Sequence, residues 1–284
     1  MPPISLHLAD CDDWLPAVFA KTLSADEQAR AQRFRHAVDG DRFVVRRGLL
    51  RRLLGERLGV APSRVPLEPG PAGKPMLAAA AFRRAGLATA NSPPGFNLAR
   101  SGGLALYAFL PLANARAVTG PAAPDGPAIG VDLERIDTAR RTLADLRRIA
   151  DHFAPEEAGF LQSLPDERAT EVFYRLWTCK EACLKCLGTG IGGRGPTLAD
   201  VVIDLNPDGS VNGRARIAFG RSWRVACFMP CPGHTAAAAV PAEEGRHGAN
   251  LPLDVDLQSI EPAAAERAVS RVAAPPPEHA PEAP

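Results

Sequence analysis

Hydrophobic and polar positions alternate along several short segments of the chain and recur with helical spacing along longer ones. Alternation predicts half-buried strands, whereas apolar residues three and four positions apart predict amphipathic helices. In the first half of the chain, these patterns predict a strand, a helical region ending near Phe34, a long helix and further strands. The strands are expected at Ile4–Leu8, near Val65–Leu67 and as a pair ending in Leu104–Pro111, and the long helix at Asp41–Leu58.

The second half of the chain presents the elements in a similar order. The patterns predict a strand at Ile129–Ile136, helices within Leu143–Phe160, a long helix at Thr170–Leu187, and strands at Val201–Leu205, Trp223–Met229 and Thr235–Pro241. Residues of the two long helices also match in position: Phe43, Arg51 and Leu54 correspond to Phe173, Glu181 and Leu184. We therefore expect an α+β fold of two similar β-α-α-β-β-β subdomains, which form a pseudo-dimer within one chain. Because each half supplies an interface to the other, we expect a monomer.

Turn-forming and apolar-poor segments set the expected boundaries. Residues 113–127 are rich in Pro, Gly and Ala, which predicts a linker between a subdomain at 1–112 and a second at 128–241. Residues 242–284 contain too few apolar groups to offset the entropy of ordering, so we expect a disordered tail. Leu251–Leu257 alternates with period two, and the alternative for this part of the tail is a short edge strand.

The composition is that of an ordinary globular protein, with 46% hydrophobic and 23% charged residues. Neither a membrane-spanning apolar run nor a signal peptide is recognisable, so we expect a cytoplasmic protein with reduced cysteines and no membrane partner. Charge is divided unevenly, because residues 1–120 hold 16 Lys and Arg against 9 acidic residues, and the rest of the chain holds 17 against 23. This division suits an anionic ligand bound by one half and a cation bound by the other, or reflects an uneven solvated surface.

Candidate metal ligands occur on the strand at Ile129–Ile136. Strict alternation places Gly130, Asp132 and Glu134 on one face. Residues two apart on a strand lie roughly 6 to 7 Å apart, so both carboxylates could reach one hard cation. The alternative is a solvent-facing strand edge.

The helix at Glu171–Gly188 carries two distinct faces. At 100° per residue, one face is apolar and the other carries aromatic and charged residues, including Glu181 and Lys185 at a spacing of four. Such a pair is also typical of a solvated salt bridge. The apolar face consists of Val172, Phe173, Leu176, Cys183, Leu184 and Leu187, and the opposite face of Tyr174, Trp177, Thr178, Glu181, Lys185 and Gly188.

Two cysteine patterns have spacings found in metal and cluster sites. Cys179, Cys183 and Cys186 match the cluster-binding spacing of radical S-adenosylmethionine enzymes, but they lie on a helix, where cysteine behaves as a small hydrophobe. Cys227, Cys231 and His234 offer three zinc ligands without an obvious fourth. We therefore expect neither an iron–sulfur nor a zinc site.

Two spaced motifs resemble a known family. Ile129–Glu134, followed by Trp177–Lys185, resembles the paired signature of 4'-phosphopantetheinyl transferases. Supporting matches upstream resemble the larger, pseudo-dimeric Sfp-type group, and the resemblance covers roughly residues 20 to 235. These matches are Glu27–Phe34, Asp41–Arg42, Arg51, Gly73–Pro75 and Phe96–Leu98.

The resemblance implies a Mg2+-dependent reaction of coenzyme A with a carrier protein. A serine of an acyl or peptidyl carrier protein takes the 4'-phosphopantetheine arm, and 3',5'-adenosine diphosphate leaves. The implied Mg2+ ligands are Asp132, Glu134 and Glu181. Glu181 is also the implied general base, directly or through water, and Lys185 stabilises the leaving phosphate. The implied coenzyme A contacts are Arg30, Arg42, Gly73, Lys74, Pro75, Arg100 and Lys185, with Arg51 either a further contact or a buried structural residue.

One departure from the family pattern concerns coenzyme A binding. The family's Ser-His reads Ala99-Arg100 here, and an arginine keeps its charge at any working pH but reaches further. Two alternatives follow: a coenzyme A-binding regulator or degenerate homologue without efficient transfer, and an unrelated Mg2+ phosphodiesterase. The motifs are compatible with carriers of fatty-acid, polyketide, nonribosomal-peptide or lysine pathways, and we expect no nucleic-acid partner.

Overall fold

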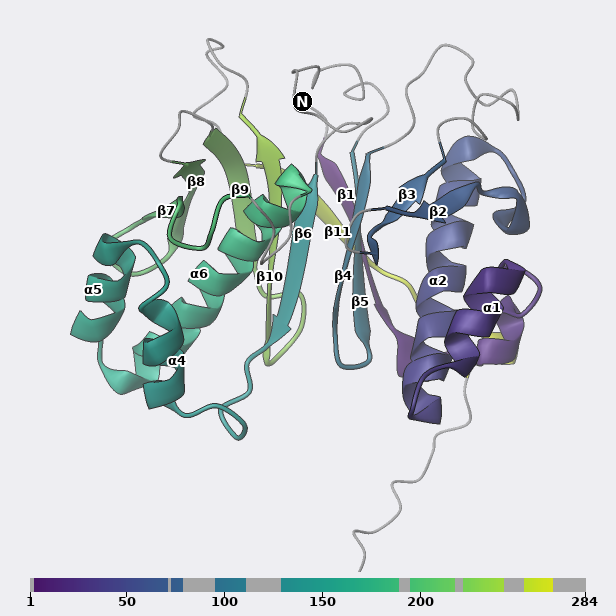
Figure 1. Ribbon diagram of the computed structural model, residues 1–284, viewed down its shortest axis with the longest axis horizontal. Coiled ribbons are helices and arrows are strands. Elements are labelled where there is room, and N and C mark those ends of the chain that lie inside the picture. The colour runs from purple at the N-terminus through teal and green to yellow at the C-terminus, as the bar shows by residue number, and fades with distance from the viewer. Residues whose placement is uncertain are drawn as a thin grey trace, which may run out of the picture.

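Two β-sheets pack face to face at the centre of the molecule and carry helices on their outer sides (Figure 1). This computed structural model describes residues 3–70, 73–78, 95–110, 129–188, 195–217, 222–242 and 253–267. The strand orders are β11-β1-β5-β4 in the first sheet and β6-β10-β9-β8-β7 in the second, and β2 and β3 form a separate pair. The expected α+β class is confirmed.

The N-terminal lobe is built around one long helix. A capping box formed by Ser24 and Glu27 begins α1, and Gly59 ends α2 with a positive φ of 67°. The long helix begins at Ala37, one turn before the predicted start. The lobe comprises β1 (Ile4–Asp10), η1 (Cys11–Asp13), η2 (Pro16–Phe19), α1 (Ala25–Gln32), α2 (Ala37–Leu58), η3 (Pro62–Arg64), β2 (Leu67–Pro69), β3 (Pro75–Leu77), β4 (Phe96–Ser101) and β5 (Leu104–Phe109).

The C-terminal lobe has the longer sheet and a second long helix. The predicted helices and strands are present, and α6 begins at Asp166, one turn before its predicted start. The strand β8 was not predicted, because its sequence combines Asn, Gly and Arg with few apolar positions. The lobe comprises β6 (Gly130–Arg135), α4 (Leu143–Ala150), α5 (Pro155–Ser163), α6 (Asp166–Leu187), β7 (Val201–Leu205), β8 (Val211–Ile217), β9 (Ser222–Phe228) and β10 (His234–Pro241).

The two lobes share a plan without repeating each other element for element. In both, a strand leads through shorter helices to a 22-residue helix, and antiparallel strands follow. Among the described residues, the N-terminal lobe diverts β2 and β3 into a separate pair, whereas the C-terminal lobe places three α-helices, α4 to α6, between its first two strands and keeps β7 to β10 in its sheet. Both lobes therefore contain the predicted β-α-α-β-β-β elements together with further helices or strands.

The C-terminal segment corrects one expectation. Strand β11 (Val255–Ser259) pairs in parallel with β1, Leu253 is buried between the sheets, and η6 (Ala264–Glu266) follows. The expected disorder of residues 242–284 is therefore wrong for residues 253–267, and the edge-strand alternative is confirmed for its described part. The hydrogen bonds to β1 supply stabilisation that composition did not reveal. The predicted linker at 113–127, and residues 243–252 and 268–284, lie outside the described residues.

No helix in the described part of the chain is long and apolar enough to cross a membrane.

Candidate functional site

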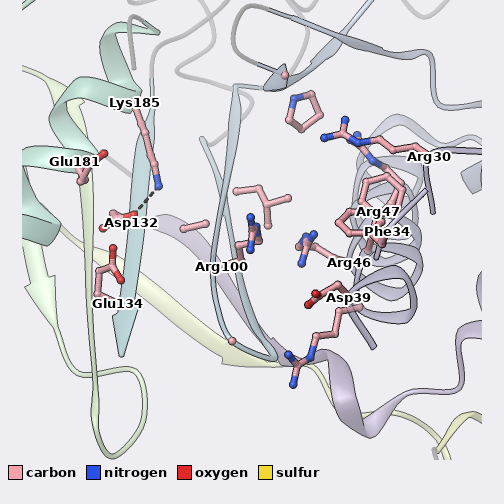
Figure 2. Close-up of a pocket in the computed structure, with 17 residues that line it drawn as sticks. Arg30, Phe34, Asp39, Arg46, Arg47, Arg100, Asp132, Glu134, Glu181 and Lys185 are labelled. Atoms are coloured by element: carbon pink, nitrogen blue, oxygen red, sulfur yellow. Dashed lines mark hydrogen bonds and ion pairs between the residues drawn. The ribbon is translucent and has the colours of Figure 1, made fainter. Parts of the chain in front are cut away.

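A cavity of about 700 Å³ is lined by residues of both lobes. Figure 2 shows its two walls: carboxylates and Lys185 come from β6 and α6, and arginines come from α1, α2 and β4. The basic and acidic halves of the sequence therefore face each other across one cavity. Its charged lining residues are Arg30, Asp39, Arg42, Arg46, Arg47, Arg100, Asp132, Glu134, Glu181 and Lys185.

The acidic wall depends on the close approach of α6 to β6. A Cβ atom at Gly130 would lie 1.8 Å from the carbonyl oxygen of Ala182, so only glycine allows the helix backbone to rest on the strand there. Alternation then turns Asp132 towards α6, and the opposite face of β6 packs into the core between the sheets. The predicted faces of this strand are confirmed. Glu181 and Lys185 reach the same cavity from α6.

Hydrogen bonds fix part of this wall and leave two oxygens without a partner. Lys185 Nζ lies 2.5 Å from Asp132 Oδ1 (Figure 2), so Lys185 pairs with Asp132 and not with Glu181 as the helical spacing suggested. Trp177 Nε1 donates to Glu134 Oε1 at 3.1 Å. Asp132 Oδ2 and Glu181 Oε1 are buried and have no hydrogen-bond partner among the described residues.

Burial and mutual repulsion disfavour the charged forms of these carboxylates. Burial raises the pKa of Asp132, and the Lys185 ammonium opposes that rise. Burial and the Asp132 charge raise the pKa of Glu134. The same two causes raise the pKa of Glu181 to about 7, with Lys185 again opposing. The cavity therefore holds a carboxyl group that titrates near neutral pH.

The predicted Mg2+ ligands line the same cavity, but their side chains do not converge on one point as the ligands of a bound metal ion would. In the part of the chain that the structure describes, no group of three His, Cys, Asp or Glu side chains is arranged to hold a metal ion. The unpartnered oxygens of Asp132 and Glu181 are nevertheless hard donors of the kind that Mg2+ prefers. The donor set therefore fits a hard divalent cation.

Three arginines of the basic wall, Arg30, Arg46 and Arg100, have no carboxylate partner among the described residues. Arg42 makes a bidentate pair with Asp12, at 2.8 and 2.5 Å. Arg47 lies 3.4 Å from Glu27, and Arg30 lies over the Phe43 ring. Like Arg30, neither Arg46 nor Arg100 pairs with a carboxylate of the described residues. Burial and the neighbouring Arg100 lower the pKa of Arg46, which is the expected effect of crowding cations around a site for an anion.

The sequence motifs did not single out Arg46 and Arg47, which line the cavity. The available signal was the spacing of four between Arg42 and Arg46, which places both on one helix face.

The remaining predicted contacts differ in their roles. Arg51 is 3% exposed, donates to Glu27 at 2.8 Å and to the carbonyl oxygens of Pro62 and Val65, and does not line the cavity. Its structural alternative is therefore the correct one. Arg100 lines the cavity.

The predicted Gly73-Lys-Pro turn contacts the last turn of α6. Gly73, with a φ of 74°, and Pro75 line the cavity. Lys74 Nζ donates to the carbonyl oxygen of Lys185 at 3.3 Å, in the last turn of α6. Burial and the nearby Lys185 charge lower the pKa of Lys74.

The helical cysteines are core residues. Cys179, Cys183 and Cys186 are buried in the hydrophobic cluster between α6 and its sheet. Cys231 Sγ lies 3.5 Å from His234 Nδ1, and neither belongs to a metal-binding group among the described residues.

Comparison with known proteins gives consistent matches. A model of the 4'-phosphopantetheinyl transferase superfamily matches residues 128–240. The chain is 36% identical over 222 residues to the 4'-phosphopantetheinyl transferase HetI of Nostoc sp., covering 78% of this chain and 79% of that protein. It is 34% identical over 193 residues to a putative 4'-phosphopantetheinyl transferase of Synechocystis sp., covering 68% of each chain. It is 25% identical over 195 residues to a 4'-phosphopantetheinyl transferase of Bacillus subtilis, covering 67% of this chain and 70% of that one.

Proposed function

The chain belongs to the 4'-phosphopantetheinyl transferase superfamily, and from this premise we propose that it transfers the 4'-phosphopantetheine arm of coenzyme A to a serine of an acyl or peptidyl carrier protein. The reaction releases 3',5'-adenosine diphosphate and depends on Mg2+. The observation that supports the proposal is a cavity in which the arginines of the basic wall face three carboxylates and a lysine. We assign the protein to the Sfp-type group, which its two-lobed chain supports.

The arginine wall suits a ligand with several phosphates. Arg46 and Arg100 have no carboxylate partner among the described residues, and guanidinium groups bind phosphate oxygens with paired hydrogen bonds. We assign the phosphates of coenzyme A to this wall, with Arg30 and Arg42 beside them. Gly73 and Pro75 line the same cavity.

The acidic wall suits the pyrophosphate of coenzyme A, where the bond would break. Asp132, Glu134 and Glu181 would hold Mg2+, which supplies positive charge that stabilises the phosphoryl oxygens of the substrate. The ammonium of Lys185 lies at the same place and can donate to the oxygen of the leaving phosphate. The pyrophosphate of coenzyme A would therefore lie between the two walls.

Glu181 is the proposed general base. Burial and the neighbouring carboxylates raise the pKa of Glu181, whereas a bound divalent cation would favour its ionised form, which can accept a proton from the carrier serine, directly or through water. The serine oxygen then forms a bond to the phosphorus next to the pantetheine arm. The bond from that phosphorus to the 3',5'-adenosine diphosphate breaks, and Lys185 stabilises the charge left on its oxygen.

Intact mass measurement tests the proposal. An apo acyl carrier protein, incubated with this protein, coenzyme A and MgCl2, should gain the mass of one phosphopantetheine, and excess chelator should prevent the gain. Asp132→Ala should abolish the gain, because the side chain faces the cavity and not the core between the sheets. Binding of coenzyme A without any mass gain, across several carrier proteins, would favour the regulator alternative.

The monomeric state and cytoplasmic location expected from the sequence belong to the same proposal. Light scattering that showed a stable trimer would contradict the first, and localisation of a tagged full-length chain tests the second.

A further inference from the structure

The ion pair between Lys185 and Asp132 places a lysine ammonium where the proposed cation site lies. The two atoms are 2.5 Å apart, and the Asp132 side chain is 6% exposed, whereas that of Lys185 is 31% exposed. A buried carboxylate is thus neutralised by a side chain that still reaches solvent. Asp132 Oδ2 stays without a partner on the other side of the same group.

Lys185 is the cation on the side of the cavity that carries Asp132, Glu134 and Glu181. Its ammonium forms an ion pair with Asp132, and Glu134 and Glu181 line the same cavity. Three clustered carboxylates repel one another and lose hydration on burial, so they require a counter-charge. In the metal-free protein this charge comes from Lys185.

The position of Lys185 allows its side chain to move. It lies in the last turn of α6, just before Gly188 ends the helix, and carries a flexible four-carbon chain. Lys74 holds its own ammonium against the carbonyl oxygen of Lys185, so a second cation lies close by. Repulsion between the two ammonium groups favours the departure of Lys185 once Asp132 has another partner, and phosphates in the cavity would offer Lys185 an anion.

We propose that Lys185 is the resident counter-cation of this carboxylate cluster and moves to the phosphates of coenzyme A when a divalent cation takes over Asp132. The proposal rests on the proposed function of the cavity. It has a thermodynamic consequence: the cation competes with Lys185 for Asp132, and coenzyme A removes that competition. The cation and coenzyme A therefore bind with positive coupling, part of which depends on Lys185.

Mn2+ binding followed by electron paramagnetic resonance tests the proposal without any turnover. In the absence of coenzyme A, Lys185→Met should bind Mn2+ about tenfold more tightly than the wild type, within the usual range of such couplings. Coenzyme A should tighten Mn2+ binding several-fold more in the wild type than in Lys185→Met. Arg175→Met is the matched control, because it removes one positive charge from the same helix at the ion pair with Glu171. Its Mn2+ affinity should equal that of the wild type.

Two further measurements separate the effect of the Lys185 charge from the effect of its packing: Mn2+ binding by Lys185→Arg, and thermal unfolding of Lys185→Met. The arginine variant keeps the charge and should keep Mn2+ affinity near the wild-type value. Without metal, Lys185→Met should unfold at a lower temperature than the wild type, and Mn2+ should raise its unfolding temperature by more.

The Mn2+ measurements distinguish failure of the counter-cation role from failure of the proposed cation site. Equal or weaker Mn2+ binding by Lys185→Met would overturn the counter-cation role and leave the proposed transferase function standing. Absence of Mn2+ binding by both proteins, with and without coenzyme A, would overturn the cation site and the counter-cation role together.

Discussion

Replacing Glu181 with Gln should stabilise the metal-free protein at alkaline pH and leave it almost unchanged at acidic pH. The pKa of this carboxyl is raised from 4.5 to about 7 in the folded protein, so the wild type loses folding free energy as the pH rises between these values. At about 1.4 kcal/mol for each pH unit, the full loss approaches about 3 kcal/mol. Because the cavity opens to water and solvent screens the charge, we expect about 2 kcal/mol between pH 5 and pH 8.

Urea unfolding in excess chelator measures this effect. The free energy of unfolding of Glu181→Gln should exceed that of the wild type by only about 0.5 kcal/mol at pH 5, just above the unfolded-state pKa, and by about 2 kcal/mol more at pH 8. Glu171→Gln serves as the control, because this carboxyl is more exposed, lies on the same helix and pairs with Arg175. A difference between Glu181→Gln and wild type that is the same at both pH values would refute the reasoning. MgCl2 at pH 8 should stabilise the wild type more than the variant, since the variant lacks one carboxylate ligand.

Three further predictions address the other parts of the site and fold. Arg51→Met should destabilise the protein by about 3 kcal/mol in urea unfolding, the low end of the range for breaking a buried ion pair because Arg47 stays near Glu27, and should leave coenzyme A affinity unchanged. Arg100→Ala should weaken coenzyme A binding by about 1.5 to 3 kcal/mol, or about ten- to a hundredfold, in isothermal titration. Unchanged affinity would mean that Arg100 points to solvent. A chain ending at residue 252 should unfold at a lower temperature than one ending at residue 267, because it loses Leu253 and the strand paired with β1. Equal unfolding temperatures would contradict a stabilising role for β11.

The periodicity of apolar residues located most helices and strands, and it identified the buried face of the strand that carries Asp132. Alternation along Ile129–Ile136 correctly separated the core face from the face with Asp132. Successive side chains of a strand point to opposite faces, so burial of one face produces an apolar residue at every second position. Helix starts were less accurate, since α2 and α6 each begin one turn earlier than the apolar pattern indicates. Strand β11 was indicated only as an alternative, because its stability comes from pairing with β1, which is more than 240 residues away in the chain.

The sequence by itself determined which residue types carry the chemistry, because motif spacing constrains local geometry along one strand and one helix. It indicated the carboxylates at 132, 134 and 181 and the basic character of the first half. Only the tertiary structure decided which charges meet. It paired Lys185 with Asp132 across two elements, buried Arg51 against Glu27, and brought Arg46 into the cavity opposite the carboxylates. Such pairings depend on how α2, β4, β6 and α6 pack, and electrostatic interactions follow distances in space, which the order of residues along the chain does not fix.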